Sequence, residues 1–185
     1  MMASDGSCLR NGQDDAIGGI GCGIWTRTNR RRDGWNSIIE ISESLDSTCN
    51  EFNMIATSPV AELGAILRVL RVIVEMIDYT CNFDDCEEFV LSTDSEYALN
   101  SIFINIPKWK KRAEKQRVST WLRRGNVAAA NQRIFEEILE ILDENFAGPD
   151  RTLRFNHCVS HDRDGHTTCR FNRIVDELAS DGVSN

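Results

Sequence analysis

The stretch Glu88-Phe89-Val90-Leu91-Ser92-Thr93-Asp94-Ser95 joins a short apolar run to a carboxylate, and it decides the fold class. The run from Glu88 to Ser92 has the length and composition of a buried β-strand. Asp94 follows at the carboxyl end of that strand, which is the edge of an open α/β sheet where ligands bind. We therefore expect an α/β fold with Asp94 at its functional edge.

A long amphipathic helix is predicted over residues 58–80, before this strand. Apolar side chains recur there every three or four residues, as on a helix with one buried face. Ser58 is a good N-cap and Pro59 suits the first helical position. Glu62 then lies in or near the first turn of the helix. A second helix is predicted after the strand, over about 95–104.

The remaining elements alternate around one sheet. Strands are predicted over 18–25, 35–41 and 153–159, and helices over about 131–144 and 172–179. The order is roughly strand, strand, strand, helix, strand, helix, helix, strand, helix, which is typical of a mixed sheet with helices on its faces. The length suits a single domain over residues 1–185 with a substantial core.

One segment concentrates the positive charge of an acidic chain. The net charge is −8, but residues 108–124 contain eight basic residues and one acid, a charge of +7 that leaves −15 for the rest. Trp109 and Trp121 lie at the edges of this segment and offer planar surfaces on which bases or sugars stack. The segment predicts a nucleic acid bound at a defined place. The alternative is a solvated helix face.

The composition excludes several classes of protein. No stretch approaches the about 20 apolar residues that span a bilayer. The first residues carry neither the basic nor the apolar part of a secretory signal. The seven cysteines are odd in number and include no Cys-x-x-Cys pair. We expect an intracellular protein of the cytoplasm or nucleus, with reduced thiols and no membrane partner.

Four short segments carry the candidate chemistry. They are Asp5-Gly6-Ser7-Cys8, Ala61-Glu62-Leu63-Gly64-Ala65, Ser92-Thr93-Asp94-Ser95 and Asn172-x-x-x-Asp176-Glu177-Leu178-Ala179. In this order, and on these elements, the chain resembles the type 1 ribonuclease H family over nearly its whole length. The resemblance implies the ribonuclease H-like fold, which is α/β with a five-stranded mixed sheet flanked by helices. It also implies hydrolysis of the RNA strand of RNA–DNA hybrids to 5′-phosphate and 3′-hydroxyl ends.

The resemblance further assigns roles to individual residues. The metal ligands would be Asp5, at the end of the first strand, with Glu62, Asp94 and Asp176. His161 would join them in catalysis from a mobile loop over about 160–171, where it would help proton transfer and product release. The substrate contacts would be Asn11, Thr57, Ser58, Glu96, Trp109, Lys110, Lys111, Trp121, Asn131 and Asn172. The tryptophans and lysines among them belong to a basic protrusion, about 108–124, that holds the DNA strand.

The cofactor implied is a pair of Mg²⁺ ions, with Mn²⁺ as a possible substitute. Hard cations call for carboxylate oxygens rather than cysteine or neutral histidine. Two such ions about 3.5–4 Å apart stabilise both the attacking and the leaving oxygen of a phosphodiester. Four converging carboxylates repel one another, so without metal at least one should hold a proton above its ordinary pKa. The expected partner is an RNA–DNA hybrid, bound by a monomer.

Other interpretations stay open. A non-catalytic hybrid-binding module on the same scaffold, or a related DNA-directed nuclease, would share much of this pattern. His157, Cys158, His161, His166 and Cys169 lie within thirteen residues and could hold a structural zinc, although their spacing fits no regular zinc module. Only four residues precede Asp5, fewer than in the family, which predicts a looser placement of this residue.

Overall fold

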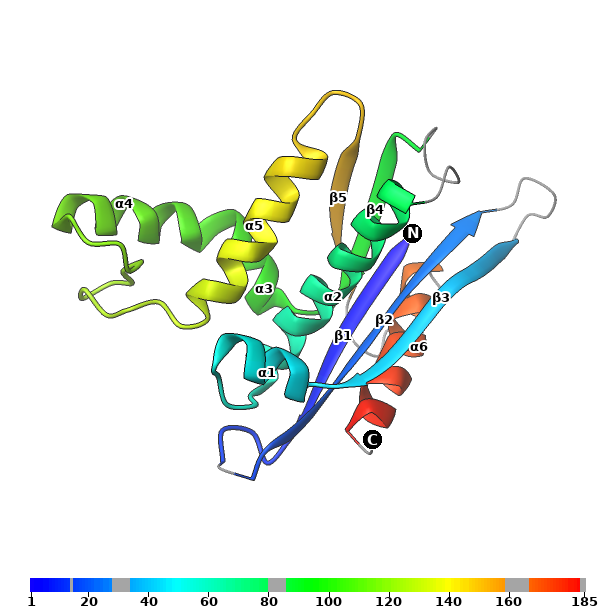
Figure 1. The fold of residues 1–185 in the computed structure, drawn as a ribbon, viewed down its shortest axis with the longest axis horizontal. Coiled ribbons are helices and arrows are strands. Elements are labelled where there is room, and N and C mark those ends of the chain that lie inside the picture. The colour runs from blue at the N-terminus through cyan, green and yellow to red at the C-terminus, as the bar shows by residue number, and fades with distance from the viewer. Residues whose placement is uncertain (14, 28–33, 80–85, 159–166, 184–185) are drawn as a thin grey trace.

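Five strands form one mixed sheet at the centre of the protein (Figure 1). The structure, a computed structural model, describes residues 1–13, 15–27, 34–79, 86–158 and 167–183, with the side chains of 167–169 excepted. The strand order is β3-β2-β1-β4-β5, with β1 spanning Met2–Leu9, β2 Ile17–Arg27, β3 Trp35–Ser44, β4 Glu88–Thr93 and β5 Thr152–His157. β1 to β3 are antiparallel neighbours, whereas β4 is parallel to both β1 and β5. The predicted α/β fold with a five-stranded mixed sheet is confirmed.

Helices cover both faces of this sheet (Figure 1). α2 (Ser58–Tyr79) and α5 (Gln132–Phe146) enclose the main core on one face, where Leu63 and Phe135 are fully buried. α6 (Thr167–Gly182) covers a smaller core on the other face, which contains Trp25 and Phe171 with ring centroids 4.5 Å apart. No helix in the described part of the chain is long and apolar enough to cross a membrane.

The start of α2 follows the prediction with a shift of one residue at the cap. The hydroxyl of Thr57 accepts the backbone N–H of Val60 at 3.3 Å, which is the bond that an N-cap makes. Asn11 accepts the N–H of Ser58 at 3.1 Å through Oδ1. Thr57 therefore caps the helix, and the prediction of Ser58 as N-cap is wrong. Pro59 takes the second helical position, where an N–H would also lack a helical partner.

The helical segment after Asp94 is longer than predicted. α3 (Glu96–Asn100) begins within one residue of its predicted start, and Ser95 is its N-cap, because Ser95 Oγ accepts the N–H of Ala98 at 3.1 Å. A π-helical turn, η2 (Ser101–Asn105), follows, and α4 (Ile106–Gln116) continues from it. Pro107 falls in the first turn of α4, directly after the π-helical turn.

Two other differences concern helix boundaries. The sequence does not predict α1 (Asp46–Phe52), a short helix between β3 and α2 that has only two buried residues, too few for a periodic signal. α6 begins at Thr167, five residues before the predicted start, so residues 167–171 are helical. The predicted histidine loop is wrong for those residues, and its earlier part lies outside the described residues.

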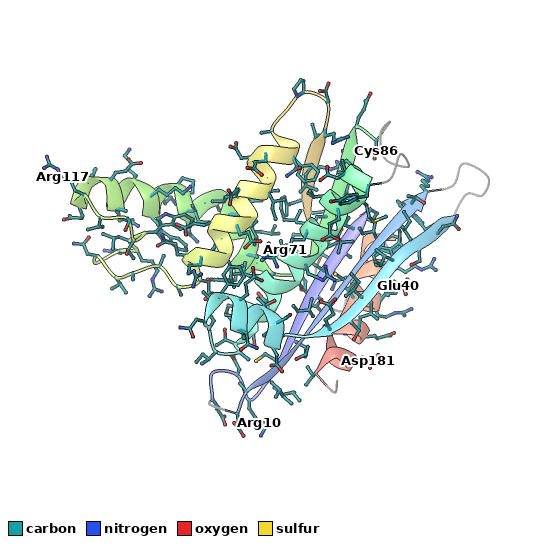
Figure 2. The ribbon with its side chains drawn as sticks, viewed as in Figure 1. Arg10, Glu40, Arg71, Cys86, Arg117 and Asp181 are labelled. Atoms are coloured by element: carbon teal, nitrogen blue, oxygen red, sulfur yellow. The ribbon has the colours of Figure 1, made fainter. Side chains whose placement is uncertain are left out.

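Two arginines of α2 hold this helix against its neighbours. Arg71 forms ion pairs with Glu51 of α1 and with Glu137 of α5, so it lies where three helices meet (Figure 2). Arg68 pairs with Glu43 of β3 at 2.8 Å. These groups are partly exposed, so each pair stabilises the fold only modestly. Together they restrain the helix that carries Glu62.

Candidate active site

Asp5 and Asp94 stand side by side on neighbouring parallel strands. The β1–β4 ladder pairs Ala3 with Ser92 and goes no further. Two residues beyond that pair, Asp5 and Asp94 occupy equivalent positions at the point where the two strands separate. Asp5 lies within β1, whose residues Met2–Leu9 all pair with β2, so its predicted position at the end of the first strand is wrong.

The electrostatics connect all four predicted carboxylates. The pKa of Asp5 is raised to about 8, first by burial and next by the charge of Asp94, and Asp176 adds both a charge and a hydrogen bond. The N–H of Gly6 donates to Asp5 Oδ1 at 2.8 Å and opposes this shift only in part. Burial also raises the pKa of Glu62, to which the charge of Asp94 adds. Carboxylates from β1, α2, the end of β4 and α6 therefore lie within electrostatic reach of one another.

The donor chemistry of this cluster fits a hard divalent cation. Its side-chain donors are carboxylate oxygens, which Mg²⁺ and Mn²⁺ prefer. Asn172 donates to Asp94 Oδ2 at 3.4 Å, while its own Oδ1 is buried and has no hydrogen-bond partner among the described residues. Such an acceptor suits a donor from a hydrated ion. In the described part of the chain no three His, Cys, Asp or Glu side chains are close enough together to bind one ion.

Two further residues, Ser95 and His157, contact Glu62 or Asp94, although neither is among the predicted site residues. The hydroxyl of Ser95 donates to Glu62 Oε2 while it also caps α3, so it links the two helices beside Asp94. His157 Nε2, at the end of β5, lies 3.2 Å from the backbone oxygen of Asp94. Serine is a residue type that caps helices, so the sequence carries a signal for the cap, but the contact with Glu62 depends on how α2 packs against α3.

An open hollow of about 670 Å³ lies beside the N-terminus of α2. It is lined by Asn11, Thr57, Pro59, Tyr97, Asn100, Ser101, Asn105, Trp109, Arg123, Ala130 and Asn131. Four of these, Asn11, Thr57, Trp109 and Asn131, are predicted substrate contacts that the structure brings to one place. Asn131 donates to the hydroxyl of Tyr97 at 3.1 Å. The hydroxyl of Ser101 is buried and has no partner among the described residues.

Sequence reasoning missed four polar residues of this hollow, which are Tyr97, Asn100, Ser101 and Asn105, whereas Arg123 belongs to the predicted basic protrusion. Three of them, Asn100, Ser101 and Asn105, lie in or next to η2. A π-helical turn shifts the residues that follow it around the helix axis, and such turns are frequent at functional sites. No sequence pattern predicts a π-helical turn here, so the position of Asn100, Ser101 and Asn105 at the hollow could be found only in the structure.

The family model of RNase H matches residues 1–184 of this sequence. The chain belongs to the RNase H family. No curated protein matches it.

Solved structures confirm the RNase H fold at low sequence identity. The RNase H domain of prototype foamy virus aligns with a TM-score of 0.67 and 17% identity, over 99% of this chain and 93% of that one. The prototype foamy virus protease–reverse transcriptase aligns with a TM-score of 0.68 and 18% identity, over 100% of this chain and 20% of its own. LC9-RNase H1, described as a type 1 RNase H with the type 2 active-site motif, aligns with a TM-score of 0.62 and 17% identity, over 99% of this chain and 72% of that one.

In this chain the basic segment is a helix followed by an irregular connection. α4 projects away from the sheet, and Arg117 lies at its far end (Figure 2). The chain has only four lysines, Lys108, Lys110, Lys111 and Lys115, and all are exposed on α4. Within the described residues, none of the eight basic side chains of 108–124 forms a salt bridge, whereas Arg68 and Arg71 of α2 do. These charges are therefore available to a ligand.

The two tryptophans of the protrusion do not offer the stacking surfaces that the sequence predicts. Trp109 is 9% exposed and packs edge-on against Phe135, with ring centroids 6.5 Å apart. Trp121 is 6% exposed, and Lys110 Nζ lies 4.9 Å from its ring centroid. The prediction of free stacking faces is wrong, because both rings are needed to bury the base of the protrusion. Trp109 still borders the hollow.

The other predicted site residues are more scattered. Glu96 is exposed at the first position of α3, one turn before Asn100 at the hollow. Ser58 lies at the start of α2, where its N–H is bound by Asn11. Lys111 points its charge outward from α4. His161 lies outside the described residues, as do His166 and the side chain of Cys169 from the zinc hypothesis.

Replacing Ser95 with Ala should weaken metal-dependent cleavage about 10- to 100-fold, since groups that orient a metal ligand typically matter by that factor. The change removes the hydroxyl that holds Glu62, and it also removes the cap of α3, at a cost of about 1 kcal/mol. The measurement is cleavage against Mg²⁺ concentration, beside thermal unfolding. Ser95→Thr retains a hydroxyl and serves as the control. A Ser95→Ala variant with the wild-type Mg²⁺ dependence would contradict the orienting role.

Proposed function

We propose that this chain is an endonuclease that hydrolyses the RNA strand of RNA–DNA hybrids by a two-metal mechanism and leaves 5′-phosphate and 3′-hydroxyl ends. The observation that carries the proposal is that Asp5, Glu62, Asp94 and Asp176 lie within electrostatic reach of one another in a member of the RNase H family. Mg²⁺ is the expected cofactor and Mn²⁺ its substitute, because the donors are carboxylates.

Several residues of the chain would have separate roles at the reacting phosphate. Two divalent ions, when bound, activate water and stabilise the departing 3′ oxygen. Asp5 must give up its proton for an ion to bind, since its pKa is raised to about 8 in the metal-free chain. Ser95 orients Glu62, and Asn172 orients Asp94, while Asn172 Oδ1, which has no partner among the described residues, would accept from a water of the hydrated ion. His161 would assist proton transfer and product release.

The hollow and the protrusion would hold the DNA strand of the hybrid. Thr57, Asn131 and Arg123 present a hydroxyl, an amide and a guanidinium to one cavity, a set that suits a phosphodiester group. The charges of α4, which form no salt bridge within the described part of the chain, lie beyond it and would contact further phosphates. Two neighbours support this partner, because the foamy viral protease–reverse transcriptase and LC11-RNase H1 are each solved in complex with RNA/DNA hybrid.

The decisive experiment is a panel of labelled duplexes incubated with and without Mg²⁺. The panel holds an RNA–DNA hybrid, an all-RNA duplex and an all-DNA duplex of one sequence. Cleavage confined to the RNA strand of the hybrid, and to the samples that contain metal, supports the proposal. Retention of the hybrid without cleavage would point instead to a binding module, and cleavage of the all-DNA duplex to a DNA-directed nuclease.

Removing charge from α4 should weaken hybrid binding and flatten its dependence on salt. Each phosphate that the protein no longer neutralises lowers the slope of log affinity against log salt by about 1. The triple change Lys108→Ala, Lys111→Ala and Lys115→Ala should therefore lower the slope by as much as about 3. The measurement is a set of binding isotherms at several salt concentrations without divalent metal. Arg154→Ala, an exposed arginine on β5 far from the protrusion, is the control, and an unchanged slope in the triple variant would contradict the role of α4.

A further inference from the structure

Two glycines flank Asp5, and they face the two helices that bring other carboxylates to it. Gly6 follows Asp5 on β1, so the position where its Cβ would lie is on the opposite face of the sheet from the side chain of Asp5. Gly21 pairs with Asp5 across the β1–β2 ladder, so it faces the same side as Asp5. α2 with Glu62 lies over the first glycine, and α6 with Asp176 lies over the second.

Gly6 lets α2 approach the sheet backbone to backbone. A Cβ atom at Gly6 would lie 2.2 Å from the carbonyl carbon of Ala61 and 2.4 Å from the nitrogen of Glu62. Neither atom belongs to a side chain that can rotate away, so any larger residue must push α2 outward. The contact falls at Glu62 itself, the residue whose carboxylate must reach the cluster.

Gly21 does the same for α6. A Cβ atom there would lie 2.0 Å from the carbonyl oxygen of Val175 and 2.5 Å from the nitrogen of Ala179. Asp176 is the next residue after Val175, and it reaches Asp5 closely enough to form a hydrogen bond and raise its pKa. Glycine is unfavourable inside a strand, where it often marks a close approach of another backbone. The close approach here occurs beside a carboxylate on both faces.

We propose that Gly6 and Gly21 are positioning residues of the cleavage site, which set how far Glu62 and Asp176 stand from Asp5. This inference rests on the proposed function, because it assumes that the carboxylates bind metal together. Gly19 provides the comparison. It faces α6 from the same strand, and its Cβ would lie 2.0 Å from the carbonyl oxygen of Ala179, which follows Asp176 by three residues. The steric conflict is equally severe there, but it falls on the far side of the carboxylate.

The test compares Gly21→Ala with Gly19→Ala by a measurement of metal binding that does not need cleavage. Mn²⁺ affinity is measured by calorimetry, and the Mg²⁺-induced rise in melting temperature is measured in parallel, since a ligand bound only by the folded state stabilises it. Gly21→Ala should bind Mn²⁺ at least about tenfold more weakly than Gly19→Ala. Hybrid binding without metal should be the same in both variants, because α4 and the hollow are unchanged.

A second variant separates positioning from general damage to the fold. Adding Asp176→Glu to Gly21→Ala lengthens the displaced carboxylate by one methylene and should recover part of the lost Mn²⁺ affinity. The same change in the wild-type chain should only weaken binding. Equal Mn²⁺ affinities in Gly21→Ala and Gly19→Ala, or the absence of rescue by Asp176→Glu, would overturn the inference.

Folding failure also gives an answer. If Gly21→Ala does not fold, Gly6→Ala takes its place, with loss of Mn²⁺ affinity as the expected result. If neither variant folds while Gly19→Ala does, the two glycines are required for the fold itself and the positioning role is refuted. A wild-type chain that cleaves no hybrid and binds no metal would overturn the proposed function together with this inference. Wild-type cleavage with equal affinities in the two β2 variants would overturn this inference alone.

Discussion

Asp94→Asn should abolish hybrid cleavage, by a factor on the order of 10³ or more, and leave hybrid binding nearly unchanged. Asp94 is the carboxylate that connects the cluster, since its charge raises the pKa of both Asp5 and Glu62. Its replacement removes one of the charged carboxylates that would bind the metal ions together with Asp5 and Glu62. Metal ions contribute several kcal/mol to the stabilisation of a phosphoryl transition state. Asparagine has the same shape and can still accept from Asn172, so the fold should persist.

The measurement is single-turnover cleavage of a labelled hybrid at saturating Mg²⁺, beside hybrid binding without metal. Asp181→Asn is the matched control, because Asp181 is an exposed aspartate at the far end of α6, the helix that carries Asp176 (Figure 2). It should cleave at the wild-type rate. Wild-type turnover in Asp94→Asn would remove the metal-binding carboxylates from the mechanism and with them the proposed nuclease.

Asp5→Asn should make the metal-free chain more stable than the wild type, and the difference should grow with pH. The pKa of Asp5 is about 8 in the folded chain against an ordinary value of 3.8. Between these values the unfolded chain loses the proton that the folded chain retains, so wild-type stability falls as the pH rises. Asparagine carries no proton to lose. One pKa unit corresponds to about 1.4 kcal/mol, so the full difference is on the order of 5 kcal/mol above pH 8.

The measurement is urea unfolding of both chains, in the presence of a chelator, at about pH 4 and about pH 8.5. The two chains should differ little at the lower pH, which lies close to the ordinary pKa of 3.8, because the unfolded chain has only begun to lose the proton that the folded chain retains. Adding Mg²⁺ at the higher pH should stabilise the wild type and not Asp5→Asn, since only the wild type has the ligand. A stability difference that does not change with pH would show that Asp5 ionises as an ordinary surface carboxylate does. Asp181→Asn again serves as the control.

Local patterns in the sequence were enough to predict the elements that carry the candidate site. α2 and β4 follow from the spacing of their apolar residues, and the start of α3 follows from its local sequence, because a cap such as Ser95 bonds to a neighbour only three residues away. The order of the four carboxylate segments along the chain was enough to suggest the family that the match over residues 1–184 shows. The failures at local level were the missed helix α1, the start of α6 five residues too late, and small shifts such as Thr57 in place of Ser58 as the cap of α2.

Contacts between distant residues were decided by the tertiary structure. The sequence suggests that Trp109 and Trp121 are surface groups, because it cannot show that Trp109 packs against Phe135 of α5 or that the connection after α4 returns along this helix with Trp121 buried. It gives no sign that Ser95 reaches Glu62, or that η2 turns Ser101 and Asn105 toward one hollow.

The glycine-rich β2 shows most clearly the difference between what the sequence predicts and what the tertiary structure decides. Its composition predicts a strand, but only the register that pairs Gly21 with Asp5, and the docking of α6 above it, give that glycine a role. Secondary structure depends on residues within about one helical turn or strand pair, which the sequence displays directly. The site depends on the register and the spacing between elements far apart in the chain, which are set by packing of the whole domain.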